Sequence, residues 1–279
     1  MFFWLNHGSF TKEFGMNNNA QVIINDPSKM GIFDLERLHT FKTVLQVLIF
    51  AAVCASLAME LPQVKPLKIS SVYLHEQGHA IMAFLTNGKV VGMKINAENE
   101  SGETSSLEGN ITFVDFSGYI FQCLVGALAL ASSYRQKSGM RFCVLLGFLT
   151  LGSVVAFLGE SPDIPTVQCG ILIIMGCVGT GFLCWSRPLW HFGSMFLRVI
   201  GTFWSSYTIF DIFHDCFESS GSDAHALAAH LGMVPWFFGI IFLAIGILAT
   251  VFAAYRSALP EPQPQPVKRR TVIAVHPRM

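Results

Sequence analysis

The sequence is poor in charged residues. Asp, Glu, Lys and Arg make up 13% of its 279 residues, whereas a soluble domain usually carries about 25%. Apolar residues make up 52% of the chain, and 25 residues are Phe. Long apolar stretches recur between short polar gaps, a pattern that is typical of helices that cross a bilayer. The composition therefore excludes an ordinary soluble domain and indicates one compact bundle of membrane helices.

The sequence also lacks an excess of charge of either sign. It contains 18 Lys and Arg residues and 18 Asp and Glu residues, so its formal net charge is zero. Proteins that bind nucleic acid usually carry a basic surface and a basic net charge. We therefore expect the lipid bilayer as a partner, and no nucleic acid.

Cysteines are few and show no regular spacing. The seven cysteines are scattered, and most lie in apolar runs, where a thiol behaves as a small apolar side chain. This distribution argues against a disulfide framework and against a thiolate zinc site. We expect buried free thiols, which do not indicate a cellular compartment.

The chain divides into three parts by composition. Residues 1–40 are polar and mixed, and we interpret them as a polar N-terminal arm. Residues 41–256 contain the apolar spans and form the membrane domain. Residues 257–279 begin with a proline-rich stretch and continue with basic residues, which indicates a disordered tail.

For the membrane domain we predict an all-α fold, a polytopic helical bundle of about six to seven transmembrane helices. A β-hairpin with strands at residues 89–96 and 107–114 is expected after the second helix. The expected spans are residues 41–61, 69–87, 116–134, 140–158, 168–186, 192–217 and 234–256.

Basic residues predict the orientation of this bundle. In a model with seven spans, they all fall on one face, which should be cytosolic because cytoplasmic loops carry an excess of Lys and Arg. The hairpin and the acidic loops fall on the other face. This model predicts a cytosolic C-terminus. The basic residues are Lys65, Lys68, Arg135, Lys137, Arg141, Arg187, Arg256, Lys268, Arg269 and Arg270.

The second span contains the motif His75-Glu76-Gln77-Gly78-His79. Residues four apart lie on the same face of a helix, so both imidazoles can hold one Zn²⁺ while Glu76 accepts a proton from water. An ionisable residue within a membrane helix costs roughly 2.5–3.5 kcal/mol on insertion scales, so three of them within five residues call for a functional reason. The alternative is that they face a water-filled cavity or the membrane surface without a metal.

A catalytic zinc site needs a third protein ligand, and Asp211 and Asp223 are the candidates. His79 lies eleven residues after Lys68, which we take as the cytosolic boundary of its helix. Asp211 lies thirteen residues after the equivalent Arg198, and so at a similar depth at about 1.5 Å per residue. Asp223 has an alternative explanation as a first-turn acid favoured by the helix dipole.

The heptapeptide LHEQGHA at residues 74–80 resembles the active-site motif of the site-2 protease family of intramembrane zinc metalloproteases. The likeness is greatest to the shorter, peptidase-like branch of that family. That branch has a hairpin turn with Gly, as at residues 87–89, a Ser-Asp-Ala helix start, as at residues 222–224, and a final aromatic span, as at residues 235–236. The resemblance covers roughly residues 70–250.

This resemblance implies an enzyme that hydrolyses peptide bonds of membrane-embedded substrates with Zn²⁺ as its cofactor. It implies that His75 and His79 bind zinc and that Glu76 is the catalytic base. It also implies a third ligand from an Asp on a later helix. The family's Asp-Gly signature is absent here; Asp223 followed by Ala is the nearest analogue by context, whereas Asp211 fits better by depth.

Two other classes of function remain open at this point. The missing Asp-Gly signature also suits a catalytically inactive relative that binds membrane clients. Intramembrane His and Asp residues also occur in helical transporters, where they form proton or metal paths. The hairpin suggests a further role within the protease interpretation, because an unwound substrate segment can pair with a strand edge; its alternative role is to plug the bundle.

Overall fold

The computed structural model describes residues 61–158, 164–217 and 222–258, together with Lys42, Leu45 and Ile49. The expected span at residues 41–61 lies almost wholly outside the described residues. So do the N-terminal arm and the tail beyond residue 258.

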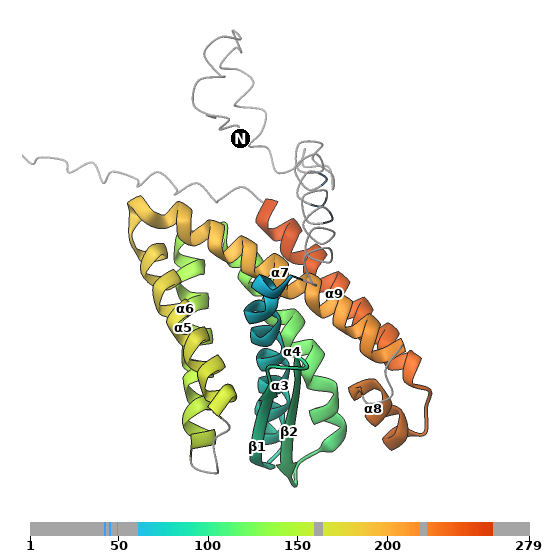
Figure 1. Ribbon diagram of the computed structural model, residues 1–279. Coiled ribbons are helices and arrows are strands. Elements are labelled where there is room, and N and C mark those ends of the chain that lie inside the picture. Colours follow the sequence, from blue (N-terminus) through green and yellow to red (C-terminus); the bar gives the residue numbers. More distant parts are fainter. Residues whose placement is uncertain are drawn as a thin grey trace, which may run out of the picture.

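Helices dominate the described chain (Figure 1). They are accompanied by one two-stranded antiparallel sheet, formed by β1 (Lys89–Asn96) and β2 (Ser101–Leu107). The helices are α3 (Lys65–Leu85), α4 (Ile111–Ser132), α5 (Gln136–Leu158), α6 (Ile164–Trp185), α7 (Trp190–Phe217), α8 (Asp223–Leu231) and α9 (Pro235–Ala258), with short 3-10 turns η2 (Pro62–Val64) and η3 (Arg187–Leu189).

Four helices of the described chain are long and apolar enough to cross a membrane: α4, α5, α6 and α9. Their mean hydropathies over an 18-residue window are 1.6, 1.8, 2.0 and 2.6. Helices α3 and α7 are of comparable length, with 21 and 28 residues, but they carry the ionisable residues of the expected site, which lower their hydropathy. Four helices therefore meet this requirement, against the six to seven spans expected.

Helix α3 begins at Lys65, earlier than the expected residue 69. Pro66 lies in the first turn of α3. A proline is tolerated there because the first helical N–H groups have no intrahelical acceptor. The motif therefore lies in the middle of α3.

The second strand of the hairpin differs from the prediction. Residues 111–114 form the first turn of α4, because the side chain of Asn110 caps this helix and accepts a hydrogen bond from the N–H of Phe113 (3.3 Å). Strand β2 is formed by residues 101–107, of which 101–106 were expected to lie between the two strands. It pairs with β1 from Asn96↔Ser101 to Lys89↔Leu107.

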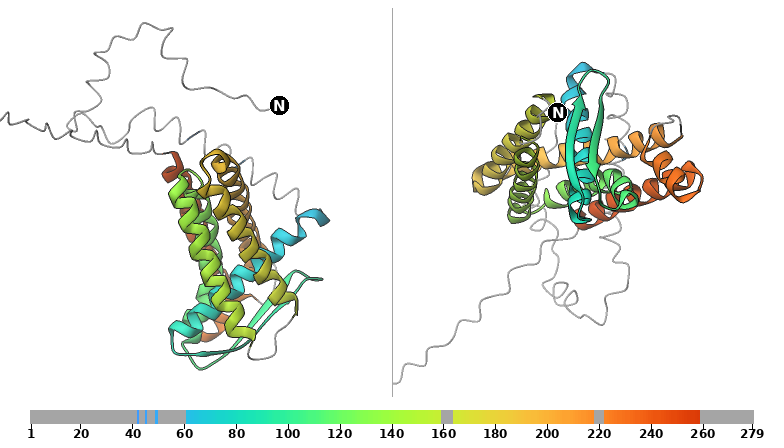
Figure 2. Two further views of the ribbon diagram at one scale, coloured as in Figure 1. Left: turned by 90° about the vertical axis from the view of Figure 1, so that its left-hand side faces the viewer. Right: turned by 90° about the horizontal axis from the view of Figure 1, so that it is seen from below.

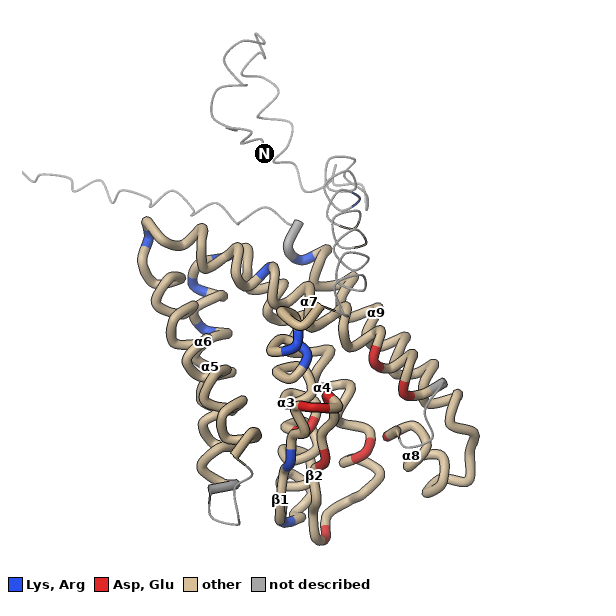
Figure 3. The backbone as a smooth tube through the Cα atoms, in the orientation of Figure 1, with Lys and Arg blue, Asp and Glu red and all other residues tan. Residues whose placement is uncertain are grey.

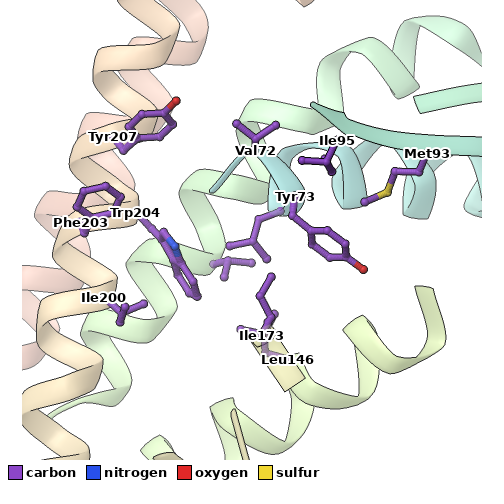
Figure 4. Packing of buried hydrophobic residues seen from close by; sticks show 12 residues of the cluster. Val72, Tyr73, Met93, Ile95, Leu146, Ile173, Ile200, Phe203, Trp204 and Tyr207 are labelled. Carbon is purple, nitrogen blue, oxygen red and sulfur yellow. The ribbon is translucent and has the colours of Figure 1, made fainter. Parts of the chain in front are cut away.

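Helix α3 occupies the centre of the described fold. It contacts α4, α7 and both strands of the hairpin, and the hairpin lies along it (Figure 2). Helices α5 and α6 form a pair on one side of α3, whereas the short α8 lies on the other side, against α4 and α9 (Figure 1). The largest apolar cluster joins Tyr73 of α3 to Trp204 of α7, Leu146 of α5 and Ile173 of α6 (Figure 4).

Charged residues are unevenly distributed along the bundle. The Lys and Arg residues of the helices lie toward the end at which α7 begins, and most Asp and Glu residues lie toward the other end, near the hairpin (Figure 3). The lysines of β1 are the exception. The sequence analysis also expected the basic residues of the helices on one face and the hairpin with the acidic loops on the other.

None of the six cysteines that the structure describes forms a disulfide. Four are buried and two are half-buried. The buried ones are Cys123, Cys143, Cys184 and Cys216.

Candidate metal centre

The motif of α3 faces α4 across a close helix contact. Gly78 lies against the backbone of α4: a Cβ built on it would lie 2.9 Å from the carbonyl oxygen of Ser117. Across the contact, a Cβ built on Gly118 would lie 2.5 Å from Nε2 of His75 and 2.6 Å from Nε2 of His79. Two glycines therefore let the helices approach and leave open the space in front of both imidazoles.

Asp223, the first residue of α8, meets these two histidines. Its Oδ2 atom lies 3.1 Å from Nε2 of His75 and 3.3 Å from Nε2 of His79. The two Nε2 atoms lie 3.0 Å from each other. Within the described chain, these three residues form the group of His, Cys, Asp and Glu side chains whose ligand atoms are close enough to share a metal ion.

Hydrogen bonds orient both imidazoles. The Nδ1 of His79 lies 2.7 Å from the carbonyl oxygen of Val114, and because a carbonyl can only accept, Nδ1 must carry the proton. The Nδ1 of His75 lies 3.3 Å from Oε1 of Gln122, whose amide nitrogen donates to Oγ of Ser71 (2.7 Å). Both Nε2 atoms are thereby left with lone pairs directed at the same point, as is usual for histidine ligands of metals.

This donor set fits a zinc ion. Zinc binds imidazole nitrogen and carboxylate oxygen at about 2.0–2.1 Å with tetrahedral geometry, which places the ligand atoms about 3.3–3.4 Å apart. The three observed separations are 3.0–3.3 Å. Two lone pairs and a carboxylate this close repel one another unless a cation lies between them. His79 is buried, and Asp223 and His75 are largely so, so solvent would screen this repulsion poorly.

Glu76 lies beside the histidines and under the hairpin. It is buried, and its Oε2 accepts a hydrogen bond from the hydroxyl of Thr104 in β2 (2.7 Å). A Cβ built on Gly102, two residues earlier in β2, would lie 2.6 Å from Oε1 of Glu76. Strand β2 therefore holds the carboxylate in place. The sequence did not indicate either residue, because both were expected in a loop.

Asp211 lies on α7 and is outside this group. The two aspartates expected as alternatives therefore occupy different places, and Asp223 is the one brought to the histidines. Another residue not indicated by the sequence is Tyr119 of α4, whose ring packs edge-on against His75 with centroids 4.5 Å apart. Its hydroxyl donates to Asp215 of α7 (2.9 Å).

Comparison with known proteins gives one match. The family model for Peptidase M50B-like proteins matches residues 44–253, which is more than half of the chain. No curated protein and no solved structure matches the sequence or the fold.

Proposed function

Because the chain belongs to the Peptidase M50B-like family, we propose that it is an intramembrane zinc metalloprotease that hydrolyses peptide bonds of membrane-embedded substrates. The family match confirms the resemblance to the site-2 proteases. Together with the four long apolar helices, it identifies the chain as an integral membrane protein related to membrane metalloproteases. The observation that carries the proposal is the convergence of His75, His79 and Asp223 beside the buried carboxylate of Glu76.

In this proposal, Nε2 of His75, Nε2 of His79 and Oδ2 of Asp223 hold the zinc ion. Asp223 is preferred to Asp211 because its carboxylate oxygen lies 3.1 Å and 3.3 Å from the two imidazole nitrogens. A zinc ion held there would lower the pKa of water toward about 7 and polarise a peptide carbonyl.

Glu76 is the proposed general base. It accepts the proton of the attacking water and returns it to the leaving amine. The hydroxyl of Thr104 holds one carboxylate oxygen of Glu76, and the absence of a side chain at Gly102 leaves room for the other. Gln122 and the carbonyl of Val114 keep the two imidazoles in the tautomer that presents Nε2 to the site.

A substrate must reach this site as extended backbone. A transmembrane helix hides its carbonyls in intrahelical hydrogen bonds, so the substrate has to unwind before Glu76 can act on it. The hairpin β1–β2 contacts α3 next to Glu76, and a strand edge can pair with the unwound segment. We assign this role to β2, because the outer edge of β1 is hydrogen-bonded to Thr166 of α6.

The orientation in the membrane is part of the proposal. Cytoplasmic loops carry an excess of Lys and Arg, and the basic ends of the helices lie together (Figure 3). Helix α9 ends near Arg256, and on this basis we propose a cytosolic C-terminus. A C-terminal tag that resists modification by a membrane-impermeant reagent in intact cells supports this side, and a tag modified in intact cells contradicts it.

The proposed function is tested by replacing Glu76→Gln. Membrane proteins of cells that produce the wild type are compared with those of cells that produce the variant. We expect fragments cut within a transmembrane segment only with the wild type, while both purified proteins contain zinc. Glu108→Gln, at an exposed position after β2, is the matched control and should behave as the wild type. An identical fragment pattern for the wild type and Glu76→Gln contradicts the protease and favours an inactive, client-binding relative.

A further inference from the structure

One of the three proposed ligands lies on α8, a short helix separate from the helix that carries the two histidines. It has nine residues, and Asp223 is the first of them. Its apolar anchors are Ala224 and Leu227, which are fully buried in a cluster with Phe242 of α9. Burial of apolar surface has no direction of its own, whereas a zinc ligand has to be placed within about 0.2 Å. Apolar packing alone therefore does not define where the Asp223 carboxylate lies.

An ion pair ties the far end of α8 to α4. Oδ2 of Asp115 lies 3.1 Å from Nδ1 of His230; 17% of the Asp115 side chain and 38% of the His230 side chain are exposed, so only the Asp115 side of the contact is shielded from solvent. His230 lies seven residues after Asp223, or about two helical turns, so both side chains are on the same face of α8. That face is attached at one end to the histidines of α3 and at the other end to Asp115 of α4.

Asp115 belongs to the turn of α4 that also orders the histidines. The residue before it, Val114, accepts the Nδ1 proton of His79. The turn ends at Gly118, which clears the space in front of both Nε2 atoms. One turn of α4 thus contacts both sources of ligands, the motif on α3 and the helix that carries Asp223.

We propose that Asp115 is a positioning residue of the metal centre, which acts through His230 to hold α8 in the register that places Asp223 on the ion. This inference rests on the metal centre of the proposed function and assigns no contact with substrate to Asp115. According to this proposal, the zinc affinity depends on the carboxylate of Asp115, although Asp115 is not a zinc ligand.

The test is the zinc affinity of the full-length protein, purified in detergent and titrated against a chelator of known affinity. Asp115→Ala and His230→Ala should each weaken zinc binding several-fold, less than the roughly 10- to 100-fold loss that follows when a partner bonded directly to a ligand is removed. The double variant should be no weaker than either single variant, because the two residues act as a pair. Asp115→Asn, which keeps the volume and removes the charge, provides the same test if the alanine variant does not fold.

The matched control is Glu100→Ala. It breaks a comparable ion pair, that of Glu100 with Lys68 (2.9 Å), which holds the hairpin and not α8. Its zinc affinity should equal that of the wild type. Thermal unfolding of the metal-free proteins checks that all variants are folded to the same extent.

Two results separate the inference from the function on which it rests. A wild type that binds no zinc contradicts the metal centre itself. A wild type that binds zinc, with Asp115→Ala equally tight, overturns only the role of Asp115.

Discussion

Gly118 of α4 lies directly against His75 of α3: a Cβ at position 118 would be 2.5 Å from the Nε2 atom that the proposed ion needs. The contact means that the shape of α4, and not only the motif on α3, decides whether a metal can enter.

Gly118→Ala should reduce zinc binding while the protein remains folded. The added methyl group would occupy the space in front of both imidazoles, so that each ring has to turn away from the shared position. Metal analysis of the purified variant should show well under one zinc per chain. Gly179→Ala is the matched control, because a Cβ at this position on α6 meets nothing within 4 Å; its zinc content should be that of the wild type. Full zinc content in Gly118→Ala would contradict the placement of the ion.

Gln122→Ala should weaken zinc binding about 10- to 100-fold, since it removes the acceptor that holds Nδ1 of His75. Ser71→Ala should have a smaller effect, because Ser71 acts on His75 only through Gln122. The measurement is again chelator competition. If Ser71→Ala proves the more damaging variant, the proposed order of these contacts is wrong.

Thr104→Val should lower the rate of cleavage and leave zinc binding intact. The hydroxyl of Thr104 donates to Oε2 of Glu76 (2.7 Å), and a hydrogen bond to a charged group contributes about 1.5–3 kcal/mol, so the rate should fall roughly tenfold or more. Thr104→Ser keeps the hydroxyl and should restore most of the rate. A loss of zinc in Thr104→Val would show that the hairpin supports the metal centre instead of the base.

Gly78→Ala should destabilise the fold itself. A Cβ there would lie 2.8 Å from Cβ of Phe121 and 2.9 Å from the carbonyl oxygen of Ser117, so α3 and α4 would have to move apart. Overpacking of this kind costs about 1–3 kcal/mol. The free energy of unfolding, measured in mixed detergent micelles, should fall by that amount relative to the wild type, and Gly152→Ala on α5, where a Cβ meets nothing within 4 Å, should leave it unchanged.

The sequence predicted the long helices of the described chain close to their observed bounds, because apolar runs in a membrane chain have few alternatives to a helix; the span expected at residues 41–61 lies outside the described residues. It placed β1 at residues 89–96 correctly but shifted β2, since the polar residues 101–107 carry little apolar alternation and the apolar residues 111–114 resemble a strand. Thr104 and Gly102 were missed for this reason. The cap at Asn110, which separates hairpin from helix, was the signal that could have corrected the register.

The third ligand was less predictable than the other two. His75 and His79 are neighbours on one helix, so their spacing alone brings them together. Counting depth along α7 favoured Asp211, because such a count assumes helices that run straight through the bundle. The short α8 breaks that assumption and carries Asp223 back to α3. The role of Gly118 at the metal centre was not predicted either, since it depends on how α4 crosses α3.

The zinc stoichiometry of the purified protein shows whether His75, His79 and Asp223 share one metal ion. We expect one zinc per chain in the wild type and in Asp211→Ala, and loss or strong weakening of that zinc in Asp223→Ala and His75→Ala. A wild type without zinc, or a zinc content that depends on Asp211 and not on Asp223, would contradict this expectation.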